Sequence, residues 1–315
     1  MNPMRQLLLW GSENRWLRDH VPRFGIARRA VRRFMPGEDV ESALAAAGRL
    51  AEEGIATVLT LLGENITATS EAEAVGTHYL ELLDRIARRG IDCTVSVKPT
   101  QLGLDLDAGL CAANLRAIVA RAAEHGRTVW IDMEASGYVD ATLEIYRAAR
   151  AESAHAGLCV QAYLHRTAED VDALLPLEPA IRLVKGAYAE PPTVALAARR
   201  DVDESYFHLA RRLLEARAEG RAVTIGVATH DLRLVRRIST AAEELGLPRD
   251  AFEIQMLYGI RPEAQRRLAA EGYRVRVLIS YGTAWYPWYM RRLAERPANV
   301  FFVLRTTFPF SGSKM

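Results

Sequence analysis

The chain has 315 residues, half of them hydrophobic and a quarter charged, so it can build a large core and wholesale disorder is excluded. Lys and Arg number 41 against 39 Asp and Glu, and the resulting net charge of +2 provides no overall field that would favour nucleic acid. The length is common for a single α/β barrel domain.

The first 50 residues are predicted to be mainly helical and to precede a barrel. Pro36 and Gly37 interrupt this segment, and Asp39 or Ser42 is expected to cap a helix that continues through Arg49. Seven arginines lie between residues 15 and 33. They indicate either a solvated helical face or a patch that meets anionic lipid or an acidic partner.

Eight short apolar runs follow, and nearly every one ends on a polar or charged residue. Successive ends fall roughly 25 to 45 residues apart, the length of one strand, one helix and two loops. Continuous apolar character is typical of parallel strands buried on both faces. The pattern predicts an α/β fold of the (β/α)8 TIM-barrel type. The predicted strands are 56–62, 94–98, 129–132, 159–163, 182–185, 224–228, 253–257 and 275–280.

Stretches rich in Ala, Leu and Arg fill most of the gaps and predict helices at 71–89, 107–125, 138–154, 203–219 and 285–295. The link from Lys185 to Val223 is the longest and contains Pro191 and Pro192. A long loop at this end of a barrel often covers a ligand. We divide the chain into an N-terminal helical segment (1–50), a catalytic barrel (51–300) and a C-terminal tail (301–315).

The three cysteines, Cys93, Cys111 and Cys159, are odd in number and lack CxxC spacing, so we expect buried, reduced thiols and a cytoplasmic setting. No His, Cys and carboxylate group has convincing metal spacing, and no metal is predicted. The apolar run at residues 7–10 is too short for a signal peptide or a membrane span.

Polar residues at the strand ends are the first candidates for chemistry, because the active sites of such barrels form at the carboxyl ends of the strands. Cations outnumber carboxylates there, so the site is expected to attract an anion. Arg291 and Arg292, on the last helix, are adjacent and suited to grip a carboxylate bidentately. The other candidates are Lys98, Asp132, Gln161, Arg182, Lys185, Thr229, His230, Asp231, Gln255 and Tyr281.

Each of these residues also has a simpler interpretation. Lys98 and Lys185 are equally explained as snorkelling or ion-paired lysines. His230 is explained as a hydrogen-bonded structural histidine, and Asp132 as charge compensation among cations. An arginine pair on a helix is often solvent-exposed, although a position just after the last strand makes this less expected for Arg291 and Arg292.

Six segments, in the same order, resemble the flavin-dependent proline dehydrogenases of the bacterial single-function type. The resemblance extends from about residue 33 to residue 299 and leaves no room for the further domains of the bifunctional proline-utilisation proteins. The segments are VSVKPTQLGLD (95–105), VWIDMEAS (129–136), IRLVKGAY (181–188), ATHD (228–231), FEIQMLYGI (252–260) and WYMRRLAERPAN (288–299).

The resemblance implies a distorted (β/α)8 barrel that holds FAD noncovalently over the strand ends. Asp132 and Arg182 are predicted to be catalytic, with Arg182 beside the flavin. The predicted cofactor contacts are Met133, Gln161, Arg182, Val184, Lys185, Gly186, Ala187, Tyr188, Thr229, His230 and Gln255. The predicted substrate contacts are Lys98, Arg291, Arg292, Leu257, Leu278 and Trp288.

The reaction implied is oxidation of L-proline to 1-pyrroline-5-carboxylate by hydride transfer to the flavin N5, with electrons passed to a membrane quinone. We expect a cytoplasmic protein with peripheral contact at the inner face of the cell membrane. Two positions depart from the family pattern: Leu278 and Trp288 stand where members usually carry substrate-lining Tyr. These changes leave open another cyclic or N-alkyl amino acid as substrate.

Two other classes of function compete with this one. A flavin-free barrel lyase would use Lys98 or Lys185 as a Schiff-base amine. A flavin- or ligand-binding relative without turnover would serve regulation, and Leu278 and Trp288 are the features that favour it.

Overall fold

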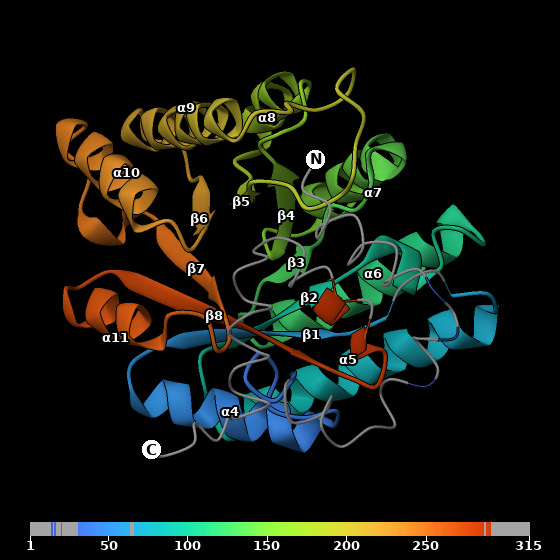
Figure 1. Cartoon of the computed structure of the whole chain (residues 1–315). Coiled ribbons are helices and arrows are strands. Elements are labelled where there is room, and N and C mark those ends of the chain that lie inside the picture. The colour runs from blue at the N-terminus through green and yellow to red at the C-terminus, as the bar shows by residue number, and fades with distance from the viewer. Residues whose placement is uncertain are drawn as a thin grey trace, which may run out of the picture.

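A computed structural model describes residues 14, 16, 20, 31–63, 66–286 and 288–290. Eight parallel strands close into a barrel in chain order, with β8 paired to β1 (Figure 1). The predicted barrel is confirmed, and β6 and β7 have the predicted bounds. The strands are β1 (Ala56–Leu61), β2 (Cys93–Val97), β3 (Val129–Ile131), β4 (Ala156–Gln161), β5 (Ala180–Val184), β6 (Thr224–Ala228), β7 (Glu253–Leu257) and β8 (Arg274–Tyr281).

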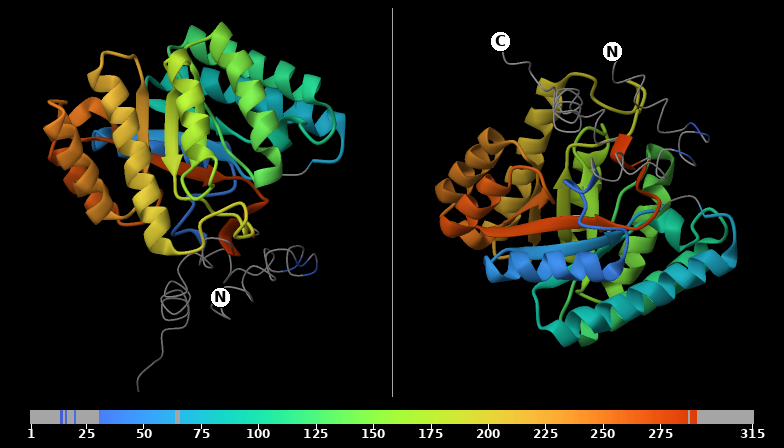
Figure 2. Two further views of the ribbon diagram at one scale, coloured as in Figure 1. Left: turned by 90° about the horizontal axis from the view of Figure 1, so that it is seen from above. Right: turned by 60° about the horizontal axis from the view of Figure 1, so that its bottom comes forward.

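Helices surround the barrel and connect its strands (Figures 1 and 2). Three of them, α8, α10 and α11, lie in gaps to which the sequence assigned no specific helix. The described helices are α4 (Val40–Glu52), α5 (Thr69–Arg89), α6 (Ala108–Glu124), α7 (Val139–Glu152), α8 (Thr167–Leu174), α9 (Arg199–Ala218), α10 (Leu232–Glu244) and α11 (Pro262–Ala270). Short 3-10 turns include η2 (Pro99–Leu102), η3 (Ser136–Tyr138), η4 (Leu175–Leu177) and η5 (Arg249–Ala251).

The two faces of the strands carry different residues. Outward positions such as Val95, Ile181 and Leu183 pack with the helices in one large apolar core. A much smaller apolar cluster of Val58, Trp130, Ala180 and Leu278 lies apart from it. These residues share the alternate, inward face of the strands with polar and charged side chains. The barrel interior is therefore partly polar, and this interior positions the site.

The helix expected after Pro36 and Gly37 is α4. Asp39 caps it as predicted, because its side chain accepts a hydrogen bond from the Ser42 backbone N–H at 2.7 Å. Burial of Leu44 and its alanine neighbours in the main core attaches α4 to the barrel. The helix ends at Glu52 and thus crosses the predicted boundary at residues 50 and 51, while the division into three segments stays a prediction.

Several predictions concern residues beyond this part of the chain. The tail at 301–315 and most of the N-terminal arginines lie outside the described residues, and of these arginines the structure describes only Arg32 and Arg33. The three cysteines are free and buried, as expected for the two in or beside predicted strands, Cys93 and Cys159. Among the residues described, no helix is both long enough and apolar enough to span a membrane.

Candidate active site

Arg182 is the central charged group of the barrel interior. It lies on β5 with 3% of its surface exposed, and its guanidinium carbon is 4.7 Å from the centroid of the Trp130 ring. Its Nε donates to Gln255 Oε1 at 2.7 Å, and its Nη1 donates to Asp132 Oδ1 at 3.1 Å. Burial lowers the pKa of Arg182, and the negative charge of Asp132 opposes this effect. Its Nη2 is buried and has no partner among the described residues.

Asp132, just past β3, is shared by two cations. Lys98 Nζ lies 3.4 Å from Asp132 Oδ2, and Arg182 binds the other carboxylate oxygen. Ser96 Oγ donates to Asp132 Oδ1 at 2.6 Å and accepts from Arg182 Nη1 at 2.9 Å. The structure thus brings together the two predicted catalytic residues and one predicted substrate contact. Two cations around one carboxylate give the cluster of Lys98, Asp132 and Arg182 one excess positive charge.

Gln161, at the end of β4, is held by backbone carbonyls. Its Nε2 donates to Met133 O at 2.9 Å and to Glu134 O at 2.8 Å. Its Oε1 is buried and finds no partner in the described part of the chain. A buried acceptor on Gln161 and a buried donor on Arg182 are therefore both left for a further group. Because buried polar atoms are normally hydrogen-bonded, these two atoms fit a polar ligand that offers an acceptor to Arg182 and a donor to Gln161.

Lys185 follows β5 and is paired with two carboxylates. Its Nζ binds Asp203 Oδ1 on α9 and lies 3.7 Å from Asp231 Oδ2. Burial would raise the pKa of Asp231, but a hydrogen bond from the Arg233 backbone and the charge of Lys185 bring it below the usual range. The candidates at the strand ends, where few carboxylates were expected, did not include Asp203, which reaches the site from α9.

His230 connects the loops that follow β6 and β7. Its Nε2 accepts a hydrogen bond from the Leu257 backbone N–H at 2.9 Å, so the proton of a neutral ring is on Nδ1. The neighbouring Thr229 donates its backbone N–H to Gln255 O at 3.1 Å. The hydrogen bond from the Leu257 backbone supports the interpretation of His230 as a hydrogen-bonded structural histidine. Contact of His230 with a cofactor stays a prediction.

Gly186 is constrained by an aromatic neighbour. Its φ of 113° lies in the left-handed region, and a Cβ at this position would meet Tyr163 Cδ1 at 2.2 Å. Farther along the same loop, Glu190 accepts hydrogen bonds from the Ser136 N–H at 2.7 Å and from its hydroxyl at 2.6 Å. The loop after β5 is therefore fixed to the loop after β3. Val184 and Tyr188 are half-buried on either side of Gly186, and Ala187 is exposed.

Apolar side chains complete this end of the barrel. Leu257 and Leu278 are register partners on β7 and β8, and both are half-buried. Leu278 packs against the interior cluster that contains Val58. Trp288 is also half-buried, whereas Arg291 and Arg292 lie outside the described residues, so the two-arginine clamp stays a prediction.

The expected place of Tyr281 at the barrel mouth is wrong. Its hydroxyl lies 2.7 Å from His78 Nε2 on α5, and 1% of its surface is exposed. Odd-numbered positions of β8 face the helices, as the burial of Val277 and Ile279 in the main core indicates. Tyr281 therefore points out of the barrel, and polarity at a strand end does not by itself decide the side chain's direction.

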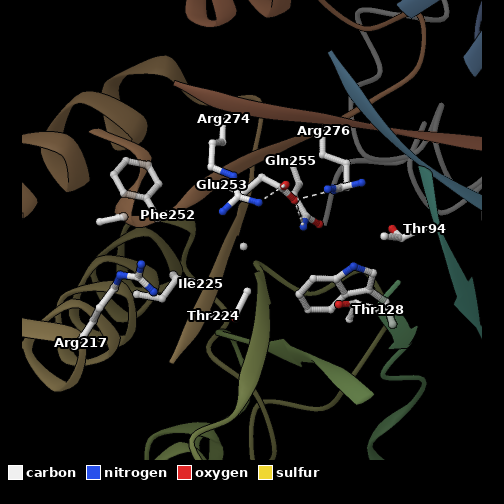
Figure 3. Close-up of a pocket in the computed structure, with 13 residues that line it drawn as sticks. Thr94, Thr128, Arg217, Thr224, Ile225, Phe252, Glu253, Gln255, Arg274 and Arg276 are labelled. Atoms are coloured by element: carbon white, nitrogen blue, oxygen red, sulfur yellow. Dashed lines mark hydrogen bonds and ion pairs between the residues drawn. The ribbon is translucent and has the colours of Figure 1, made fainter. Parts of the chain in front are cut away.

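The opposite end of the barrel holds a cavity of about 90 Å³ (Figure 3). Gln255 reaches it from β7, together with Glu253 and the β8 residue Arg276. Sequence reasoning missed Glu253 and Arg276. The available signal was alternation, because Glu253 and Gln255 flank Ile254 as polar residues two positions apart on one face.

Comparison with known proteins identifies the family and supports the fold. The family model described as "Proline dehydrogenase" matches residues 43–305. "Proline dehydrogenase 1" of Bacillus subtilis subsp. natto is 39% identical over 302 residues, which are 96% of this chain and 98% of the relative. "Proline dehydrogenase" of Deinococcus radiodurans is 41% identical over 278 residues, which are 87% and 88% of the two chains.

The solved structure of proline utilization A from Bdellovibrio bacteriovorus is similar in fold, with a TM-score of 0.81. Its sequence is 23% identical, and the match covers 98% of this chain and 38% of that longer one. Both the barrel and the family indicated by the six sequence segments are thereby confirmed. The chain belongs to the proline dehydrogenase family.

Proposed function

We propose that the protein oxidises L-proline to 1-pyrroline-5-carboxylate with FAD as cofactor and passes the electrons to a membrane quinone in proline catabolism. The family match and the named relatives support an oxidoreductase that acts on proline. The observation that carries the proposal is the buried Arg182 guanidinium, anchored at Nε and Nη1, whose Nη2 has no partner among the described residues.

The residues present fit FAD. Arg182 would donate to it and Gln161 Oε1 would accept from it, and the other predicted contacts except Gln255 lie at or just beyond the ends of β3, β5 and β6. Bound FAD would supply the hydride acceptor. The cation at Arg182 would stabilise negative charge that develops on reduction, because a preorganised charge in a buried site needs little reorganisation.

Substrate binding would use the excess positive charge of the cluster formed by Lys98, Asp132 and Arg182. Lys98, oriented by Asp132, is placed to attract a carboxylate. Arg291 and Arg292 would complete the clamp according to the sequence prediction. The half-buried Leu257 and Leu278 would provide an apolar wall against which a saturated ring can pack. The substrate amine must lose its proton before its lone pair can assist hydride departure.

Another cyclic or N-alkyl amino acid is the second candidate substrate. Leu278 favours it, because this side chain lies in an apolar cluster and offers no hydroxyl where family members usually carry Tyr. A Schiff-base lyase is disfavoured, since its lysine must be free to attack a carbonyl carbon. Lys98 and Lys185 are instead each held in an ion pair with a carboxylate.

The deciding experiment is anaerobic titration of the purified, FAD-loaded protein with L-proline and with other cyclic and N-methyl amino acids. Bleaching of the oxidised-flavin absorption by L-proline in preference to the others is expected. Preferential bleaching by another compound would reassign the substrate, and bound FAD that none reduces would favour a ligand-binding role. A colourless protein that takes up no FAD would refute the proposal, and borohydride trapping of a carbonyl substrate on Lys98 or Lys185 would favour the lyase.

The electron acceptor needs its own test. The proline-reduced protein should be reoxidised faster by vesicles that contain a quinone than by quinone-free vesicles of the same lipid. Equal rates would refute the quinone assignment, and co-flotation with anionic vesicles would separately test the predicted membrane contact.

A further inference from the structure

Gln255 lies between two charged side chains in the barrel interior, Arg182 and Glu253. Figure 3 shows Gln255 beside Glu253. Its Oε1 accepts from Arg182 Nε at 2.7 Å, and its Nε2 donates to Glu253 Oε1 at 2.8 Å. A guanidinium only donates and a carboxylate only accepts, so a single orientation of the amide satisfies both neighbours. Gln255 is 4% exposed, so both hydrogen bonds are enclosed in the barrel interior, beside the cavity that Gln255 and Glu253 line.

Glu253 is fixed in turn from the other end of the barrel. Arg276 Nε donates to the same Glu253 oxygen at 2.8 Å. Arg276 Nη1 donates to Thr57 O at 2.8 Å and to Asp92 Oδ1 at 3.1 Å. We call Arg276, Glu253, Gln255 and Arg182 the interior chain. It is a continuous series of hydrogen bonds from the cavity end of the barrel to the candidate active site.

The interior chain restricts how Arg182 can move. Ser96 and Asp132 hold Nη1, and Gln255 holds Nε. The guanidinium is planar and rigid, so fixing these two nitrogens also fixes the direction of Nη2. Without Gln255 the Nε–H would be a buried donor with no acceptor, and the group could relieve this only by turning away.

We propose that Gln255, oriented by Glu253, is a positioning residue for Arg182, and that it thereby sets how strongly the site prefers reduced over oxidised FAD. This role rests on the proposed function, since it acts on the flavin through Arg182. It is distinct from a direct cofactor contact, because the described polar contacts of the Gln255 side chain are to protein side chains.

The test is the two-electron midpoint potential of FAD bound to the full-length protein. Gln255→Leu should weaken the preference for reduced over oxidised FAD by about tenfold, which corresponds to a fall of about 30 mV in the midpoint potential. Glu253→Leu should give a similar fall, because the amide loses the acceptor that orients it. In Glu253→Gln the fall in potential should be less than half of that in Glu253→Leu, since the side-chain oxygen of the new glutamine can still accept from Gln255. Equal potentials in Glu253→Gln and Glu253→Leu would mean that charge acts rather than orientation, and would overturn the proposal.

Gln265→Leu is the matched control. Gln265 is an equally buried glutamine that donates to Leu257 O at 3.0 Å and to Ile260 O at 2.9 Å, away from Arg182. Its loss should lower stability as Gln255→Leu does and leave the flavin potential unchanged. A potential that falls equally in both variants would reduce Gln255 to a packing role.

A second measurement needs no flavin. In ¹⁵N spectra of the apoprotein, exchange of the Arg182 Nε–H with solvent should be slow in the wild type and faster in Gln255→Leu. Unchanged exchange would overturn the positioning role even if FAD binds. A wild type that takes up no FAD would instead refute the proposed function and the effect on potential, while the exchange rates still decide whether Gln255 holds Arg182.

Discussion

Asp132→Ala should be among the more destabilising single substitutions at this site. The carboxylate is 18% exposed and is shared by Arg182 at 3.1 Å and Lys98 at 3.4 Å, whose side chains are 3% and 15% exposed. Removing one partner of a buried ion pair costs about 3–5 kcal/mol, because the other charge stays buried. Asp132→Asn keeps an oxygen for Ser96 and Arg182 and loses only the charge, so its cost should be about 1–3 kcal/mol.

Urea denaturation of the apoprotein measures these costs, from midpoints at constant slope. Asp84→Ala is the control, because Asp84 also pairs with two groups, Arg121 at 2.7 Å and His125 at 3.1 Å, but is more exposed, at 32% against 18% for Asp132. Its cost should stay near or below 1 kcal/mol. Two results would refute the reasoning: Asp132→Ala within about 0.5 kcal/mol of the wild type, or equal costs for Asp132→Ala and Asp84→Ala.

Three further outcomes are expected. Gly186→Ala should destabilise the protein by about 1–3 kcal/mol in urea denaturation, because the new Cβ overlaps Tyr163. Gly137→Ala, whose Cβ would enter open space, should be nearly neutral, and equal costs for the two variants would contradict the prediction. Arg291→Met should weaken substrate affinity by about 2–5 kcal/mol in steady-state kinetics with normal FAD content, and an unchanged KM would remove Arg291 from the clamp. Burial holds the pKa of His78 below its usual value of 6.5, so the stability that neutral His78 contributes is present above pH 6.5 and is lost as pH falls through the folded pKa. Urea midpoints measured in a pH series should therefore decline less with falling pH in His78→Gln than in the wild type. Parallel declines would exclude this role.

The positions of the strands could be predicted because their signal is local. Apolar runs such as those of β6 and β7 match the observed bounds, and their spacing leaves room for a helix between neighbours. A parallel strand buried on both faces must be nearly continuous in apolar character, and this property is visible in a single sequence. The same reasoning found Lys98 and Asp132, because parallel strands bring their carboxyl ends to one side of the barrel. Arg182 lies in the middle of β5, and its catalytic role was predicted from the family resemblance.

Partners that come from distant elements could not be predicted in this way. Asp203 binds Lys185 from α9, and nothing near it in sequence marks it as part of the site. Tyr281 closes a strand but faces α5, where His78 meets its hydroxyl. When both faces of a strand are buried, apolarity no longer distinguishes inside from outside, so the direction of a strand-end side chain depends on the register of the closed barrel.

The sequence by itself determined the eight-stranded barrel, the family and the end of the barrel at which the candidate residues gather. Only the tertiary structure decided that Asp132 is shared by two cations and that Gln255 connects Arg182 to Glu253. The physical reason is distance along the chain. Backbone conformation responds to neighbours a few residues away. In the interior, an ion pair joins β5 to the end of β3 and a hydrogen bond joins β5 to β7, and these elements meet only after the barrel has closed.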